Sequence, residues 1–296
     1  MRSDAVALVG TRERMRDFVA LAKPRLNLLV VASTLAGYWM AGTDGLGALR
    51  LVGTLLGTGL VAGGASAFNQ LFERDLDALM RRTRMRPLAD QRLQPIEGAV
   101  FATAIAVTGL LMLAAAANLL AAAVALVTLV SYVLIYTPLK RRSSLATVIG
   151  GIPGALPPII GWAAARGDLS ANAWILFGIV FLWQLPHFLA IAWICREDYA
   201  RAGYLMLPVI EPDGRSTGRQ SVLYAAALVP LSLAPTLMGL AGKSYFAGAL
   251  VLGLIFTALT IRFANTRSVR DARWVFFGSI IYLPLIWILM IADRIA

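Results

Sequence analysis

Long apolar stretches alternate along this chain with short clusters of charged residues. Nine of the stretches are long enough to cross a bilayer, since a helical span takes about 20 residues. Helices satisfy their own backbone polar groups in lipid, which favours them over strands. The predicted spans are residues 26–43, 48–71, 98–117, 119–138, 145–165, 172–195, 220–240, 244–263 and 273–292. Nine spans is the expectation, and seven is the alternative that keeps the same parity.

The composition also indicates a membrane protein. The chain has 296 residues, of which 59% are apolar and 15% charged. These values differ from the roughly 45–50% and 25% that are usual for soluble domains. They exclude a disordered chain, and the single cysteine, Cys195, excludes a disulfide scaffold. We therefore expect an all-α integral membrane protein.

The basic residues are distributed unevenly across the predicted topology. Of the 27 Lys and Arg residues, 23 fall in the N-terminal segment and in the loops after the second, fourth, sixth and eighth spans. Basic loops stay cytoplasmic, so the N-terminus is predicted to be cytoplasmic and the C-terminus to lie on the far side. The net charge of +11 therefore reflects topology rather than nucleic-acid binding. Residues 1–25 are expected to form a polar cytoplasmic segment, and residues 26–293 a single intramembrane domain.

A stripe of oxygen-bearing side chains leaves the second span on the cytoplasmic side. Asn69, Glu73 and Asp77 follow one another at intervals of four, which places them on one face of a helix. Amide and carboxylate oxygens suit Mg²⁺, which is commonly shared with substrate phosphates. The arginines that follow, such as Arg74 and Arg81, would hold phosphate oxygens. In the alternative interpretation, the carboxylates pair with these arginines at the membrane surface.

Two further groups of charged residues are expected on the same face. Glu197 and Asp198 follow the sixth span, so two spans deliver carboxylates to one side. Lys140 and Arg141 follow the fourth span, where they either bind diphosphate or only enforce the topology.

Two features lie within the predicted spans. The chain has one histidine, His187, directly after Pro186 in the sixth span. A lone histidine in a membrane helix hydrogen-bonds a neighbouring helix, ligates a haem iron or acts as a base. The fifth span is rich in glycine and proline, and irregular backbone at membrane depth is tolerated where it is buried or lines a cavity. We interpret this helix as a wall of a substrate chamber.

Three segments together resemble the UbiA-type intramembrane prenyltransferases, and within them the branch that farnesylates haem. The segments are NQLFERDLDALMRRTRMRPL at 69–88, YTPLKRRS with GALPPIIGW at 136–143 and 154–162, and WQLPHF with REDYARAG and MLP at 183–188, 196–203 and 206–208. The family motif Asn-x₃-Asp-x₃-Asp has Glu73 in its middle place here. The second motif, usually two spaced aspartates, is reduced to Glu197-Asp198.

The resemblance implies a bundle of about nine helices around a central cavity whose active site faces the cytoplasm. It implies transfer of the farnesyl group of farnesyl diphosphate to a vinyl group of haem b, with addition of water. Mg²⁺ would be the cofactor, held by Asn69, Glu73, Asp77 and Asp198. Asn69, Asp77, His187 and Asp198 would be the catalytic residues. Diphosphate would be bound by Arg74, Arg81, Lys140 and Arg141.

The expected location is the cytoplasmic or inner membrane of the cell, with a haem A synthase or an oxidase-assembly protein as a partner. Three other functions compete, one of which is a structural haem-binding or assembly protein that would bind haem without consuming farnesyl diphosphate. A prenyltransferase of the same family would use an aromatic or quinone-precursor acceptor, which the Pro-His-Phe segment disfavours. A transporter also carries intramembrane carboxylates and broken helices, and would give flux without a covalent product.

Overall fold

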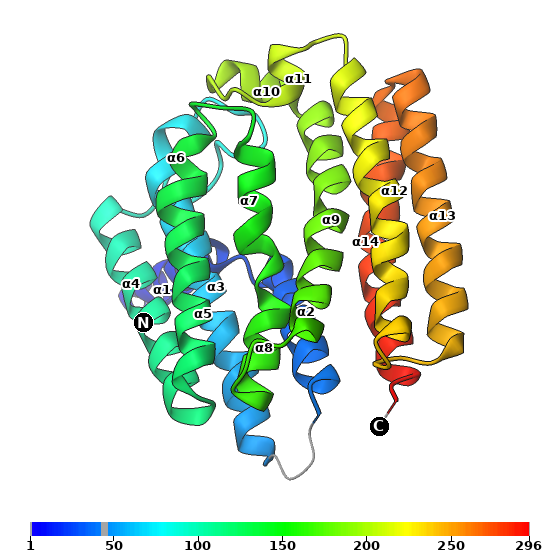
Figure 1. The fold of residues 1–296 in the computed structure, drawn as a ribbon. Helices are drawn as coiled ribbons and strands as arrows, with labels where there is room; N and C mark the ends of the chain where they lie inside the picture. Colours follow the sequence, from blue (N-terminus) through cyan, green and yellow to red (C-terminus); the bar gives the residue numbers. More distant parts are fainter. Residues whose placement is uncertain (1, 43–46, 296) are drawn as a thin grey trace.

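The computed structural model describes residues 2–42 and 47–295, with side chains from residue 12 onward. Within these ranges the regular elements are helices, and the only β pairing is an isolated bridge between Ala241 and Arg294. The elements are α1 (Arg2–Ala22), α2 (Pro24–Met40), α3 (Ala48–Asp77), α4 (Pro95–Ala116), α5 (Leu119–Val130), the π-helix η1 (Ser131–Tyr136), α6 (Thr137–Leu139), α7 (Ala146–Ala155), α8 (Pro157–Arg166), α9 (Ala171–Ile194), α10 (Arg196–Arg201), α11 (Leu207–Ile210), α12 (Arg215–Leu237), α13 (Lys243–Thr266) and α14 (Val269–Ala292) (Figure 1).

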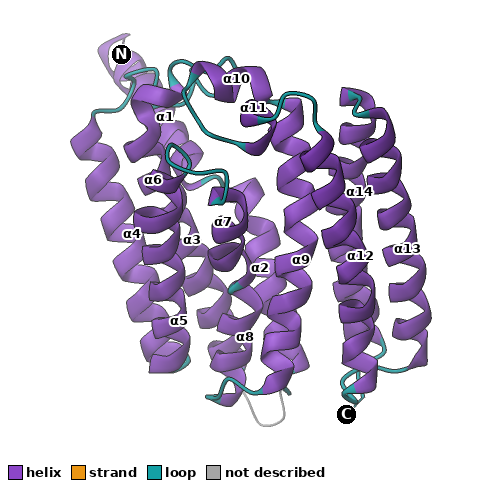
Figure 2. Ribbon diagram, turned by 45° about the horizontal axis from the view of Figure 1, so that its top comes forward, coloured by secondary structure: helices purple, strands orange, loops and turns teal. Residues whose placement is uncertain are grey.

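The predicted fold class is confirmed. Eight long apolar helices of the described chain are able to cross a membrane, and the bent pair of residues 12–22 and α2 makes a ninth. Each predicted span coincides with one of these elements, although residue 43, the predicted end of the first span, lies outside the described residues. The helices stand side by side in a bundle in which α14 packs against both α9 and α2 (Figure 2).

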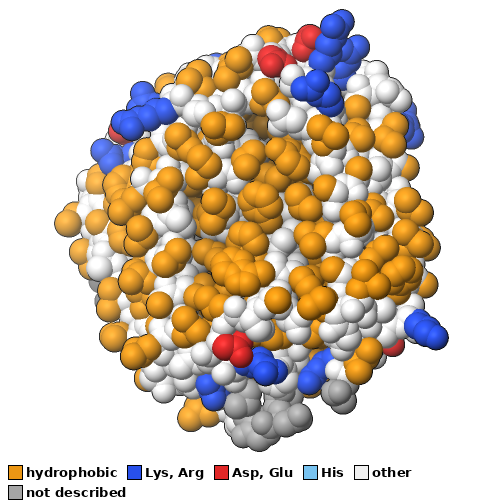
Figure 3. Space-filling model, in the orientation of Figure 1, with side chains coloured by type: hydrophobic (Ala, Val, Ile, Leu, Met, Phe, Trp, Pro, Cys, Tyr) orange, Lys and Arg blue, Asp and Glu red, His pale blue; other side chains and the backbone are white. Residues whose placement is uncertain are grey.

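The outer surface of the bundle is apolar in the middle and charged at both ends. Figure 3 shows hydrophobic side chains across the centre of one face and Lys, Arg, Asp and Glu near its upper and lower edges. Exposed large apolar side chains occur on nearly every long helix, for example Leu56, Leu111 and Phe277. A soluble protein rarely exposes such a continuous surface, whereas a bilayer covers it. The chain is a multi-pass membrane protein.

The fifth predicted span is broken into α7 and α8 at Leu156, where Pro157 begins the second helix. Its small residues allow α8 to cross α2 closely. A Cβ atom on Gly161 would overlap the backbone carbonyl of Thr34, and one on Gly37 would overlap that of Pro158. This close crossing is the packing that small residues permit in membranes. It closes the bundle below the space where α3, η1, α7 and α9 surround a cavity.

The N-terminal segment folds onto this bundle. Phe18 and Leu21 of α1 pack with apolar residues of α3 and α4, and the Phe18 and Phe101 ring centroids are 5.2 Å apart. Lys23 separates α1 from α2 in a left-handed backbone conformation, with φ of 47°. The two helices are bent by 43° at this break. Lys23 is thereby turned toward the interior, where it lines the cavity.

Candidate active site

The cavity lies at the end of α3, among the elements that form the upper part of the bundle in Figure 1. Its volume is about 300 Å³. Asn69, Glu73 and Asp77 all line it, and their exposed fractions are 3%, 5% and 1%. The spacing of four residues therefore produces the single face that the sequence predicts. Leu26 also lines the cavity although it is 69% exposed, which places part of the cavity rim at the outer surface of α2.

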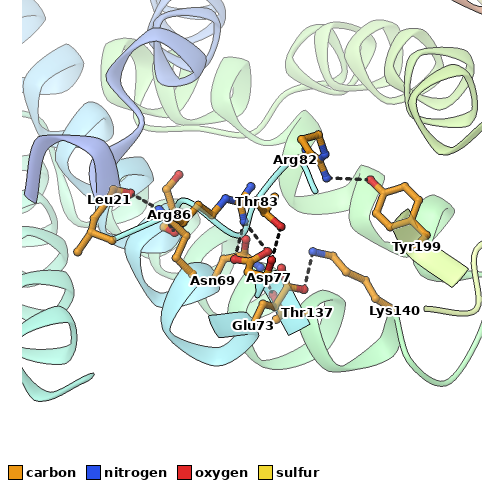
Figure 4. A network of polar contacts seen from close by, with 12 residues as sticks. Leu21, Asn69, Glu73, Asp77, Arg82, Thr83, Arg86, Thr137, Lys140 and Tyr199 are labelled. Carbon is orange, nitrogen blue, oxygen red and sulfur yellow. Dashed lines mark hydrogen bonds and ion pairs between the residues drawn. The ribbon is translucent and has the colours of Figure 1, made fainter. Parts of the chain in front are cut away.

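Each carboxylate of the cavity is paired with a cation from another element. Lys140 Nζ lies 2.8 Å from Glu73 Oε1. One guanidinium nitrogen of Arg86 donates to both oxygens of Asp77, at 2.9 and 2.7 Å (Figure 4). Burial would lower the pKa of Lys140, but Glu73 outweighs this effect and raises it, so the ammonium stays charged. These pairs join α3 to the loops that follow α3 and α6.

The cavity holds more positive than negative charge. Lys23, Arg82, Arg86 and Lys140 line it together with the two carboxylates of α3. These four basic side chains outnumber the two carboxylates, and without Lys23 three cations still face two anions. Lys140 is buried, Lys23 and Arg86 are partly buried and Arg82 is exposed, and a cleft lined by such basic side chains attracts a polyanionic ligand. A diphosphate group meets this requirement and accepts hydrogen bonds from both Lys and Arg.

The amide of Asn69 is oriented by its neighbour Thr137. Thr137 Oγ1 donates to the carbonyl of Tyr132 at 2.9 Å, and Asn69 Nδ2 lies 3.2 Å from the same Oγ1 (Figure 4). The Thr137 hydroxyl has one proton, which is used on Tyr132, so it accepts from Asn69. The oxygen of the Asn69 amide is thus directed away from Thr137. The carbonyl of Tyr132 accepts from both the backbone N–H and the hydroxyl of Thr137, because η1 is a π-helix, an irregularity that is frequent at functional sites.

Four tyrosines complete the wall of the cavity: Tyr132, Tyr136, Tyr199 and Tyr204. Lys140 Nζ lies 4.5 Å from the centroid of the Tyr136 ring, within cation–π distance. Burial, with Glu73 as the next cause, raises the pKa of Tyr204, so its phenol stays neutral. The tyrosines present ring faces and neutral hydroxyls next to the charged cluster.

The structure places Asp198 outside the cavity lining. Its carboxylate accepts from the backbone N–H groups of Arg81 and Arg82, both at 3.3 Å, and pairs with Arg201. Burial alone would raise the pKa of Asp198, but these backbone N–H groups and then Arg201 hold it below its ordinary value. Asp198 therefore fastens α10 to the loop after α3. In this arrangement its oxygens do not join those of Asp77 or Glu73.

Three of the arginine and lysine residues predicted for diphosphate also lie outside the cavity lining. Arg74 is beside Asp75 and donates to the carbonyl of Leu71. Arg81 contributes its backbone N–H to Asp198, and its side chain is exposed. Arg141 lines a neighbouring surface hollow on the other side of Glu73. Of the four predicted residues, Lys140 is the one that lines the cavity.

His187 lies on α9 directly before Phe188, which lines the cavity, and one turn before Ile191. Its Nδ1 is 2.7 Å from Ser279 Oγ of α14. The Trp183 and Phe276 rings stack on the imidazole, with centroids at 5.5 and 5.1 Å. Ile191, four residues further along α9 and hence on the same helix face, lines the cavity.

Sequence reasoning missed Lys23, Arg82, Arg86 and the tyrosines as members of the site. Arg86 belongs to a cluster of arginines, and nothing in the spacing separates it from Arg81 or Arg84, because the chain between α3 and α4 is irregular. Lys23 directly precedes Pro24, and a polar residue at the start of an apolar span is the only signal that it gives. The tyrosines are spread over η1, α10 and the loop after α10.

The donor set of the cavity fits Mg²⁺. Two carboxylates and one amide line it, and hard cations prefer such oxygen ligands. The amide of Asn69 directs its oxygen rather than its nitrogen away from Thr137, as a ligand requires. Among the described residues, no group of three or more His, Cys, Asp and Glu side chains is arranged to hold a metal. The set therefore depends on the amide and on the oxygens of a ligand, as is usual for Mg²⁺ bound with phosphates.

Comparisons with known proteins agree with this fold. The sequence pattern of the UbiA prenyltransferase family matches residues 30–281, and the chain belongs to that family. Protoheme IX farnesyltransferase of Solibacter usitatus is 47% identical over 289 residues, which cover 95% of this chain and 99% of that protein. The protoheme IX farnesyltransferase of Gloeobacter violaceus is 45% identical over 285 residues, covering 95% and 92% of the two chains.

Solved structures share the architecture at low sequence identity. A structure of digeranylgeranylglyceryl phosphate synthase superposes with a TM-score of 0.79 at 16% identity, covering 96% of this chain and 99% of that one. A UbiA homologue from Archaeoglobus fulgidus bound to GPP and Mg²⁺ gives a TM-score of 0.67 at 18% identity, with 93% and 99% coverage. At these identities the likeness establishes the fold.

Proposed function

We propose that the protein transfers the farnesyl group of farnesyl diphosphate to a vinyl group of haem b, giving haem O and diphosphate. The observation that carries this proposal is the buried, net positive cavity built around Asn69, Glu73 and Asp77. Relatives over 40% identical along most of the chain are named protoheme IX farnesyltransferase, which supports haem as the acceptor.

The diphosphate group is proposed to bind between Lys23, Arg82, Arg86 and Lys140. These residues supply ammonium and guanidinium donors from the break between α1 and α2, the loop after α3 and the loop after α6, which neutralise the charge of a leaving group. Mg²⁺, when bound to Asn69, Glu73 and Asp77, supplies further neutralisation of the phosphate oxygens. Of the residues expected from the sequence, four lie outside the cavity lining in this arrangement: Asp198, Arg74, Arg81 and Arg141.

In the reaction, the bond between the farnesyl C1 and the diphosphate oxygen breaks and the electron pair leaves with diphosphate. The vinyl carbon of haem b bonds to C1, and the positive charge moves to the carbon next to the porphyrin ring. Water adds there and loses a proton, so that atoms and charge balance. The tyrosine rings and the apolar α9 side chains keep water from the first cation.

The lateral position of Leu26 gives the apolar substrates a route from the bilayer. Farnesyl and porphyrin groups partition into lipid, and a cavity whose rim reaches the outer surface of α2 receives them there. The proposed location is the inner membrane with the site on the cytoplasmic side, as basic loops at that end predict. A haem A synthase or an oxidase-assembly protein is the proposed recipient of the product.

The test is to incubate membranes that contain the protein with haem b, farnesyl diphosphate and Mg²⁺. We expect a mass increase of haem that corresponds to one farnesyl group plus one hydroxyl group, and free diphosphate. Removal of Mg²⁺ with EDTA and the Asp77→Asn substitution should each abolish product formation. Activity that survives both would contradict the metal site. Use of 4-hydroxybenzoate in place of haem, or flux without a covalent product, would support the competing functions.

A further inference from the structure

The hydrogen bonds of Ser279 fix the protonation of the His187 ring. Ser279 Oγ donates to the carbonyl of Phe276 at 2.6 Å, and His187 Nδ1 lies 2.7 Å from the same Oγ. A hydroxyl has one proton, so both contacts are hydrogen bonds only if Nδ1 carries a proton and donates it to Ser279. In the neutral imidazole, Nε2 is then the nitrogen with a free lone pair.

The ring is also held by two aromatic neighbours. Trp183 and Phe276 stack on it with interplanar angles of 19° and 24°, so rotation of the imidazole would break both contacts. Trp183 is itself fixed, because its Nε1 donates to the backbone carbonyl of Ser279 at 2.8 Å. Three contacts therefore immobilise a side chain whose Nε2 makes no hydrogen bond to any residue that the structure describes.

Such an arrangement is typical of a metal-ligating histidine. Histidines that bind metals almost always donate their other N–H to an oxygen, which fixes the tautomer and the ring orientation. The proximal ligand of many haem proteins is a neutral imidazole of this kind. A purely structural histidine in a membrane helix gains from hydrogen bonds at both nitrogens, and His187 uses only one.

The position of His187 fits a porphyrin next to the diphosphate site. Phe188 and Ile191 line the cavity, and Ile191 lies on the same face of α9 as His187, about 6 Å further along the helix axis. The imidazole is half-buried, so the ring is not sealed inside the bundle. A porphyrin whose iron lies at Nε2 would thus lie below the charged end of the cavity.

We propose that Nε2 of His187 is the axial ligand of the iron of the haem substrate, and that Ser279, Trp183 and Phe276 are its positioning residues. This inference rests on the proposed function for the identity of the acceptor. The ligand bond fixes the height and tilt of the porphyrin relative to the diphosphate cavity. It leaves the vinyl groups at the ring edge free to react.

The test uses the full-length protein, purified through an affinity tag without histidine and reconstituted in nanodiscs. His187 is the only histidine of the chain, so an imidazole signature has one possible source. We expect ferric haem to give a shifted Soret band and the ferrous nitrosyl complex to show nitrogen hyperfine structure from a trans imidazole. His187→Ala should lose both signals, and added imidazole should restore them.

Metal-free protoporphyrin IX distinguishes binding through the iron from binding through contacts with the porphyrin ring. It keeps the vinyl groups and lacks iron. The wild type should bind haem about tenfold or more tightly than protoporphyrin. His187→Ala should bind the two equally. Ser279→Ala should weaken haem binding several-fold with an altered nitrosyl spectrum. The matched control is Ser232→Ala, which removes a buried hydroxyl bonded to Tyr282, and it should leave the spectrum unchanged.

Two results would overturn the inference: a nitrosyl spectrum that is unchanged in His187→Ala, or a wild type without imidazole ligation. The proposed function fails independently of this. If the wild type forms farnesylated haem but the spectrum is the same in His187→Ala, the proposed function holds and His187 is not the iron ligand. If the wild type binds haem iron through His187 but never farnesylates haem, His187 is the iron ligand and the proposed function is wrong.

Discussion

Thr137 is the residue that decides which end of the Asn69 amide faces the cavity. Its hydroxyl is occupied by the carbonyl of Tyr132, so it accepts from Asn69 Nδ2 and leaves the amide oxygen for a cation. Both Thr137 and Asn69 are buried. The orientation of the Asn69 amide is therefore set by the Thr137 hydroxyl, which donates its proton to the carbonyl of Tyr132 in the π-helix.

Thr137→Val should raise the Mg²⁺ concentration needed for half-maximal activity. Loss of one neutral hydrogen bond costs about 1 kcal/mol, which corresponds to about fivefold. Thr137→Ser keeps the hydroxyl and should stay close to the wild type. A Mg²⁺ titration of prenyl transfer measures the effect. Equal titrations for the valine and serine variants would contradict the role of Thr137.

Lys140 and Glu73 should behave as a coupled pair. Lys140→Met leaves a buried carboxylate without its partner, and such a loss costs about 3 to 5 kcal/mol. Glu73→Gln combined with Lys140→Met removes both charges and should recover most of the unfolding free energy while activity stays absent. Thermal unfolding in detergent and product formation measure the two effects. A double variant as unstable as Lys140→Met would show that the pair is not coupled.

Arg86 should matter for the diphosphate more than the arginines outside the cavity. Arg86→Gln removes a guanidinium that lines the cavity and bonds Asp77, and we expect KM for farnesyl diphosphate to rise about 10- to 100-fold. Arg84→Gln alters an exposed arginine of the same loop and serves as the control. Arg141→Gln should change KM less than Arg86→Gln. A larger rise in KM for Arg141→Gln than for Arg86→Gln would indicate that diphosphate binds in the hollow that Arg141 lines.

The crossing of α2 and α8 should tolerate no side chain at its glycines. Gly161→Ala places a methyl group against the carbonyl of Thr34, which forces the helices apart and costs about 1 to 3 kcal/mol or more. Gly47→Ala meets no atom within 4 Å and has an ordinary backbone conformation, so it is the matched control. Thermal unfolding should separate the two variants by several degrees. Equal midpoints would contradict the close crossing.

Asp198 should contribute stability that disappears in acid. Its folded-state pKa lies below the ordinary 3.8, so the ionised form is favoured by folding. This contribution is present above the ordinary value and is lost as the pH falls through the folded-state value. Asp198→Asn should be less stable than the wild type at neutral pH, and the difference should vanish in strong acid. A stability difference between the two proteins that persists at every pH would show that it arises from packing and not from the charge of Asp198.

Much of the fold follows from hydropathy because a bilayer demands long apolar helices. All nine predicted spans coincide with helices or bent pairs, and the break at Leu156 lies where the prolines of 153–158 cluster. The stripe of Asn69, Glu73 and Asp77 is equally local, because helical periodicity alone places the three side chains together.

The remaining members of the site depend on contacts between distant segments. Asp198 is drawn to backbone N–H groups of the loop after α3, and no spacing within the sequence reveals that contact. Lys23 enters the cavity through one left-handed residue at a helix break. Arg86 differs from Arg81 only in the direction that an irregular loop gives it. Residue type and local periodicity do not encode such directions.

The excess of cations around the cavity has an effect after the reaction as well as before it. Diphosphate released by cleavage carries more charge than the ester that entered, so Lys23, Arg82, Arg86 and Lys140 hold the departing product more firmly than the substrate. Release of inorganic diphosphate should then be the rate-limiting step of turnover. Higher ionic strength, which screens these attractions, should speed the steady state while it slows capture of the prenyl donor.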